Sequence, residues 1–421
     1  MQNVIHLECL LIVLGVALLP AGRTRSLAAC AAIGSGLALA GLRAGPAQPV
    51  ATLPPGFVAV EGALLVIGGL LALTSALAAL RSARTPANVV GSAALAGGGL
   101  GVVLSGGRYL IAAPTGALLI AVIVIAGVGA LLVAAGRLVR AAVPQDRPQS
   151  PPIALALIGG GALLAAVSSS TGGVFVGCML AAIGGWLISR PSATRNLPVA
   201  PMVVLLLLLP AWRLMATIAG PEGLSIGALP DLPWSPAAER LLAPVLLLAA
   251  WVMSGLWPWH RQEPAALTAP VAALLVARVA IPAVPDGLDH WRALAFPLVM
   301  LGLWHGVLTR RRAESASGLA WVGLVTATPV GQAGGALVLL AGLALELAER
   351  LPARVKWAAP GVRAVATVVL STGALLAIEG GLQTEVVYTV LAAAALVVGA
   401  GWQPSVQAST ASAPTVTEPS A

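Results

Sequence analysis

The sequence predicts an all-α, polytopic membrane protein with about 14 to 15 transmembrane helices, arranged as one bundle. Hydrophobic residues make up 58% of its 421 residues and charged residues only 9%, whereas about a quarter of an ordinary soluble domain is charged. The apolar runs are long and unbroken. Outer-membrane barrels instead show ~10-residue segments of alternating polarity. This composition excludes a water-soluble globular protein.

Hydropathy, together with the Pro, Gly and Arg residues that mark helix ends, predicts where each helix lies along the chain. The first set lies near residues 3–21, 26–44, 57–80, 88–107, 109–136, 152–168, 171–189 and 199–219. The second set lies near residues 240–258, 264–284, 292–309, 315–328, 331–349, 362–380 and 383–401. We therefore expect residues 1–402 to form a single transmembrane domain. Residues 403–421, rich in Ser, Thr, Ala and Pro, are expected to form a disordered cytoplasmic tail.

The basic residues predict how these helices are oriented, because short cytoplasmic loops collect Arg and Lys. Connections after odd-numbered helices carry Arg23, Arg25, Arg81, Arg84, Arg137, Arg140, Arg147, Arg190, Arg195, Arg261, Arg310 to Arg312, Arg350, Arg354 and Lys356. Even-numbered connections carry Arg43, Arg108, Glu222, Asp231, Asp286 and Asp289. We therefore expect a multi-pass protein of the cell membrane with its N-terminus outside and its C-terminus in the cytoplasm. Its +8 net charge is spread over helix ends, so the lipid bilayer is the expected partner and nucleic acid is not.

Motifs for a cofactor, a metal or covalent catalysis do not stand out. The first apolar stretch lacks the basic n-region of a cleavable signal peptide, so we expect the first helix to be retained. Cys9, Cys30 and Cys178 lie in apolar runs without the spacing of a zinc site or a disulfide framework. Gly-rich stretches near residues 97–101 and 159–161 lack phosphate-loop patterns and favour close helix packing. We predict no catalytic, cofactor-binding or metal-binding residue.

Ionisable residues inside apolar runs are the functional candidates, because a charge within a bilayer costs several kcal/mol. Arg213 and Arg278 lie well within such runs, and Glu346 lies one turn inside the end of its helix. His260 and His305 lie nearer to helix ends, and histidine is the side chain whose usual pKa lies near neutrality. These five residues are the candidate ion pathway. A purely structural role for the two arginines is the alternative.

The segment around the tryptophans of residues 251–304 has a distinctive order. Trp257-Pro258-Trp259-His260 ends one predicted helix, and Ala269-Pro270-Val271-Ala272-Ala273-Leu274-Leu275 lies in the next. Further along, Arg311-Arg312 precedes Ser315-Ala316-Ser317 and Gly323. This order resembles the signature of the antiporter-like membrane subunits of respiratory complex I, membrane-bound hydrogenases and Mrp-type cation/proton antiporters. The likeness covers roughly residues 200–350.

The resemblance implies a proton-translocating type of subunit within a complex I-like (NADH-quinone oxidoreductase) or hydrogenase-like membrane complex. Its implied partners are the other membrane subunits of that respiratory-type complex. In the family, a lysine lies about two turns before the histidine, and this chain has Met253 or its neighbours there. On the following helix the nearest basic residue is Arg278, offset by two or three residues from the family's lysine or histidine. Because arginine does not release its proton, we expect a divergent scaffold subunit with an impaired proton path.

Two other classes of function are open at this stage, so whether the protein is an enzyme is undecided. A membrane-embedded lipid-linked sugar polymerase or transferase usually has a large outer loop bearing Arg, His or Asp. The longest outer loop here, near residues 220–239, contains Glu222 and Asp231 but no histidine. An independent secondary transporter needs a discontinuous helix at the midplane. Pro282 and Pro285, next to Asp286, are the sequence signals for such a break.

Overall fold

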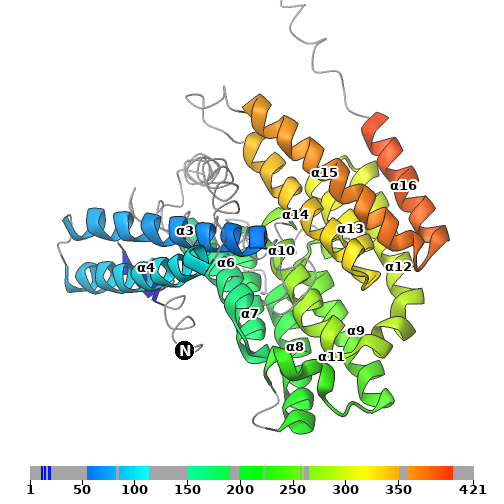
Figure 1. The fold of residues 1–421 in the computed structure, drawn as a ribbon, viewed down its shortest axis with the longest axis horizontal. Coiled ribbons are helices and arrows are strands. Elements are labelled where there is room, and N and C mark those ends of the chain that lie inside the picture. Colours follow the sequence, from blue (N-terminus) through cyan, green and yellow to red (C-terminus); the bar gives the residue numbers. More distant parts are fainter. Residues whose placement is uncertain are drawn as a thin grey trace, which may run out of the picture.

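The structure is a computed structural model, and its described residues form an all-α assembly (Figure 1). They are residues 11–12, 14–15, 18–19, 55–81, 85–112, 150–189, 199–220, 224–256, 258–259, 265–349 and 359–401. Six of the helices within these ranges are long and apolar enough to cross a membrane. The prediction of an all-α membrane protein is therefore confirmed, whereas the total number of spans stays a prediction. The predicted helix 26–44, most of the predicted helices 3–21 and 109–136, and the tail 403–421 lie outside the described residues.

The described helices follow the predicted order. In the first half they are α3 (Pro55–Arg81), α4 (Pro86–Ala112), α6 (Ser150–Val167), α7 (Thr171–Ser189) and α8 (Val199–Ala219). In the second half they are α9 (Pro236–Met253), α10 (Ala265–Leu275), α11 (Ile281–Ala283), α12 (Pro285–Leu308), α13 (Arg312–Val325), α14 (Pro329–Glu349), α15 (Ala359–Leu382) and α16 (Val386–Gly401). A short 3₁₀ helix, η2 (Ile226–Asp231), precedes α9, and a π-helical turn, η4 (Val276–Ala280), joins α10 to α11.

Helix starts that hydropathy placed too late are explained by local capping. α9 begins four residues before the predicted position because the Ser235 side chain accepts a hydrogen bond from the Ala238 N–H and proline occupies the first turn. α12 begins at Pro285 rather than near residue 292. Its first turn holds Pro285 and Asp286, a proline and an acidic residue that both favour a helix N-terminus.

The predicted helix 264–284 is interrupted rather than regular. The π turn η4 follows α10, and the three-residue α11 contains Pro282. Val284 then leaves helical geometry, with φ −139° and ψ 54°, before α12 starts. π turns occur frequently at functional sites. Between Pro282 and Pro285 the chain thus leaves one helix and begins the next.

Helices that are consecutive in the sequence pack as antiparallel hairpins, most closely α3 with α4, α6 with α7 and α14 with α15 (Figure 1). Glycines permit this close packing. A Cβ atom on Gly161 of α6 would lie 2.5 Å from the carbonyl oxygen of Gly177 on α7. On α14, a Cβ atom on Gly334 would lie 2.7 Å from the carbonyl oxygen of Gly373 on α15. Small residues at these crossings let the backbones approach each other, as in lipid-embedded helix pairs.

α10 lies at the centre of the bundle and contacts α6, α7, α9, α13 and α14. The helix connections meet at two ends. At the end that we name the Arg278 end, Ile226 N–H donates to the Ser169 carbonyl at 2.8 Å, and Gly287 N–H donates to Glu239 Oε2 at 3.1 Å. At the opposite end, which we name the His305 end, α12 finishes and α13 starts. The helices thus run between two polar ends around a centre that is mainly apolar.

Candidate functional site

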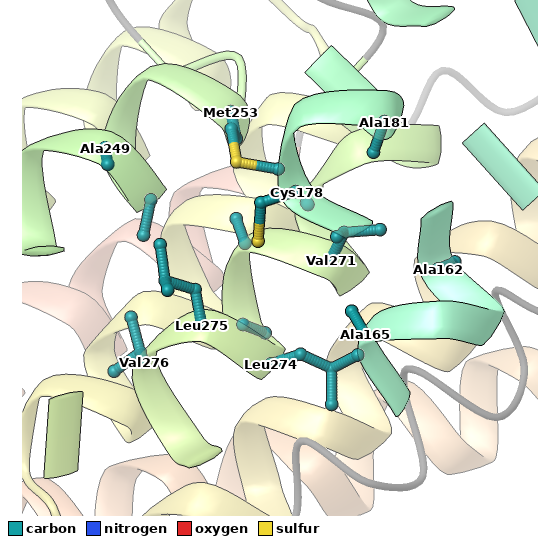
Figure 2. Close-up of a cluster of buried hydrophobic side chains, with 14 of the residues drawn as sticks. Ala162, Ala165, Cys178, Ala181, Ala249, Met253, Val271, Leu274, Leu275 and Val276 are labelled. Carbon is teal, nitrogen blue, oxygen red and sulfur yellow. The ribbon is translucent and has the colours of Figure 1, made fainter. Parts of the chain in front are cut away.

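A cluster of buried hydrophobic side chains lies where the resemblance places a proton path (Figure 2). Met253 of α9 occupies the position expected for the family's lysine and has no exposed surface. Leu275 and Val276 occupy the expected place of the basic residue on the following helix, and both are buried. Cys178 of α7 completes this cluster as a buried free thiol, which behaves as a small hydrophobe. The described side chains around Met253 therefore include no lysine, histidine or carboxylate.

Arg278 lies in the π turn η4 and reaches the C-terminal end of α6. Its Nη1 donates to the carbonyls of Ala165 at 2.7 Å and Ala166 at 2.6 Å. Its Nη2 donates to the carbonyl of Ser168 at 2.8 Å. The last carbonyls of a helix lack intrahelical partners and carry partial negative charge. The guanidinium is therefore a cation fixed on the end of α6.

The turn that holds these carbonyls is itself well connected. Ser168 is fully buried, and its hydroxyl donates to the Ser170 carbonyl at 2.9 Å. Ser170 and Ser225 form an isolated antiparallel bridge. Thr171 N–H also donates to the Leu224 carbonyl at 2.9 Å. Arg278 consequently links the helix α10–η4–α11 to the turn after α6. The same turn is hydrogen-bonded to the segment before η2.

Arg213 is placed differently from Arg278. Its side chain is exposed on α8, the candidate span with the smallest buried share, 22% against 50% for α7. The neighbouring Trp212 is 38% exposed, and its indole lies near Gly172 in the first turn of α7. Trp and Arg are typical residues of membrane interfaces. Within the described residues, Arg213 is thus an exposed residue of α8, whereas Arg278 is half-buried.

His305 lies in the last turn of α12 and pairs with a carboxylate that we did not single out in the sequence. Its Nδ1 lies 2.8 Å from Oε1 of Glu314. The Glu314 side chain is 3% exposed and that of His305 is 27% exposed. Gly306 permits this contact, because a Cβ atom there would lie 2.6 Å from the backbone nitrogen of Ser315. A carboxylate in the first turn of α13 is also favoured by the positive end of the helix dipole.

Glu314 was missed because the predicted helix began at residue 315, which left this carboxylate in a basic loop. α13 in fact begins at Arg312, so Glu314 faces into the bundle. A possible signal was its position at the third residue of a helix, where Glu is favoured.

The two remaining candidates are only partly covered by the structure. His260 lies outside the described residues, and so does the motif residue Trp257. Glu346 is part of α14, but its side chain lies outside what the structure describes. The described members of the candidate pathway do not meet, since Arg278 and His305 lie at opposite ends of the bundle. The 20 residues between Pro285 and His305 on α12 correspond to about 30 Å.

A buried polar contact joins α9 and α13 between these ends. Trp321 Nε1 donates to the Ser254 hydroxyl at 2.7 Å, and that hydroxyl donates to the Ala250 carbonyl at 2.8 Å. Trp251 packs edge-on against Trp321, with ring centroids 5.7 Å apart. Every donor in this small network has a fixed acceptor. We interpret it as a structural joint between two helices.

No known protein-family model and no curated protein sequence matches the chain. The likeness to antiporter-like subunits therefore rests on the motif residues themselves. In the part of the chain that the structure describes, no group of three or more His, Cys, Asp or Glu residues is placed to hold a metal ion.

Proposed function

We propose that this protein is a divergent antiporter-like subunit of a complex I-like or hydrogenase-like membrane complex, in which it acts as a scaffold without conducting protons. The motif residues of the region 200–350 support the family. The apolar cluster around Met253 supports the absence of conduction and is the observation on which this proposal depends (Figure 2).

Proton transfer through protein needs groups that gain and lose protons at hydrogen-bonding distance from one another. Arginine side chains do not act as proton donors in proteins, and the three Arg278 contacts of known length are all with backbone carbonyls. The His305–Glu314 pair lies at the other end of the bundle. Between the two ends, Met253 and Leu275 supply no relay group. Among the described side chains, a proton entering at either end would meet this hydrophobic cluster.

The outer surface of the bundle suits a protein that is enclosed by lipid or by other membrane subunits. Large apolar side chains are exposed on α8, α12, α15 and α16. We propose that these faces contact the bilayer and the other membrane subunits of a respiratory-type complex. From the arginine distribution we further propose that the His305 end faces the cytoplasm, with the N-terminus outside and the C-terminus inside.

A secondary transporter is the second candidate function, because the π turn η4 interrupts the regular hydrogen bonding of the helix α10–η4–α11, and transporters use irregular helices for their ion sites. An independent transporter would move an ion or a solute without partner subunits. A scaffold would move no ion by itself and would be found with partner subunits in the membrane. A transporter would move its ion or solute as an isolated protein.

Affinity purification of the tagged full-length protein from its native membranes in a mild detergent tests the scaffold function. We expect it to co-purify in fixed stoichiometry with membrane subunits of a respiratory-type or hydrogenase-type complex, and deletion of its gene to lower the amount of assembled complex. Isolation as a single species, with the complex assembled normally after deletion, would contradict the proposal.

A further inference from the structure

The carbonyls that surround the Arg278 guanidinium have the form of a cation site. Three backbone oxygens, those of Ala165, Ala166 and Ser168, point to one place at the C-terminal end of α6. The end of a helix carries about half a negative charge. Carbonyls of unwound segments and of helix C-terminal ends are the groups that bind coupling cations in transporters with broken helices. Here the π turn η4 of the helix α10–η4–α11 packs against the same point.

We propose that the end of α6 is a binding site for a monovalent cation, and that the guanidinium of Arg278 is its permanent, tethered occupant. The site takes a planar, hydrogen-bonding cation of the guanidinium class. When the Arg278 side chain is removed, free guanidinium binds in its place.

The geometry favours a guanidinium over a spherical charge. Nη1 donates to two successive carbonyls at 2.7 and 2.6 Å, and Nη2 donates to a third at 2.8 Å. The planar fork of arginine fixes the directions of these donors, whereas a lysine ammonium is a compact point charge on a flexible stem. Charge-assisted bonds of this length are roughly twice as strong as neutral ones. The α6 carbonyls are thus matched in number and direction to a guanidinium.

Because the guanidinium is covalently attached to the chain, it cannot leave the site. A site that is always filled cannot exchange its cation with either side of the membrane, so the π turn η4 is held in place rather than available for transport. These hydrogen bonds join α6 to η4 across more than a hundred residues of sequence. This proposal depends on the Arg278 hydrogen bonds and not on the proposed scaffold function, because a proton-conducting protein could contain the same hydrogen bonds.

Chemical rescue of Arg278→Ala in the full-length protein, reconstituted in nanodiscs, tests the proposal. We expect the substitution to lower the melting temperature by several degrees, and millimolar guanidinium chloride to restore at least half of that loss. Urea, which has a similar shape but no charge, and choline chloride, which has the charge but no N–H donors, should restore none of it. Arg213→Ala is the matched control, because its exposed side chain makes no such contacts, and guanidinium should not raise its melting temperature.

If Arg278→Ala does not accumulate in cells, cell-free synthesis into nanodiscs keeps the test decisive. Millimolar guanidinium chloride should then increase the folded yield of the variant, and urea should not. The proposal is overturned if guanidinium has no effect on the variant, if urea or choline acts equally well, or if Arg213→Ala responds to the same degree. These results would leave the scaffold function unaffected, since that function is tested by co-purification.

Discussion

Removing either member of the His305–Glu314 pair should destabilise the protein, and the two substitutions should differ in size. Nδ1 of His305 lies 2.8 Å from Oε1 of Glu314. The carboxylate is 3% exposed, whereas the imidazole is 27% exposed. His305→Ala takes a hydrogen bond away from a carboxylate that water hardly reaches. Glu314→Gln keeps a polar group of the same shape beside an imidazole that water can reach.

The burial of each group sets the expected free energies. Losing the partner of a buried charge costs about 3–5 kcal/mol, and partial exposure of His305 places its removal near the lower limit, at about 3 kcal/mol. A hydrogen bond between neutral groups contributes only about 1 kcal/mol, so Glu314→Gln should cost about that much. The difference of about 2 kcal/mol corresponds to a roughly 30-fold difference in the unfolding equilibrium constant.

Equilibrium unfolding of the reconstituted protein, followed by tryptophan fluorescence, measures both free energies. His290→Ala on the same helix is the matched control, because His290 is exposed. This substitution should change the free energy of unfolding by no more than about 0.5 kcal/mol, as is usual for surface positions. The double variant should be less destabilised than the sum of the two single variants, since they share one interaction. Equal changes in the free energy of unfolding for the two single variants, or changes that add strictly in the double variant, would refute the assignment of a buried carboxylate that is hydrogen-bonded to His305.

Three further predictions test the packing and the orientation. Gly334→Val should destabilise the α14–α15 hairpin by about 1–3 kcal/mol, whereas Gly107→Ala, with open space around its Cβ position, should have no such cost; thermal unfolding compares them. Ser254→Ala should lower stability by about 1–3 kcal/mol, because it leaves the buried Trp321 N–H without its acceptor, and Trp321→Phe in the same background should add little more. A cysteine at position 262 should react with a membrane-impermeant thiol reagent only from the cytoplasmic side, and labelling from outside alone would reverse the proposed topology.

Much of the fold could be predicted because membrane helices are encoded locally. Each crossing needs about 20 apolar residues, and the limits of α7 and α8 matched the predicted 171–189 and 199–219. Hydropathy failed where polar residues lie inside a helix. The first turns of α12 contain Asp286 and Asp289, so the prediction placed its start seven residues too late. The 3₁₀ helix η2 has only six residues, which is too short to give a hydropathy signal.

The candidate site could be predicted only in part, because its contacts join residues that are far apart in the sequence. Arg278 was identified from its place in an apolar run, but its carbonyl partners lie at least 110 residues earlier. Arg213 had the same sequence signal and proved to be exposed, since hydropathy does not tell which face of α8 is covered. The position of Met253 was predicted from the motif spacing, and the structure places it in the apolar centre.

A flux measurement shows whether the hydrophobic cluster around Met253 blocks proton movement. The purified full-length protein in liposomes, under an imposed pH gradient or membrane potential, is followed with a pH-sensitive dye in the presence and absence of sodium. Protein-free liposomes and liposomes holding an active proton/cation antiporter set the two limits. We predict no proton or sodium flux above the protein-free level. A robust flux that Glu346→Gln or His305→Ala abolishes would contradict the account and make the protein an active antiporter.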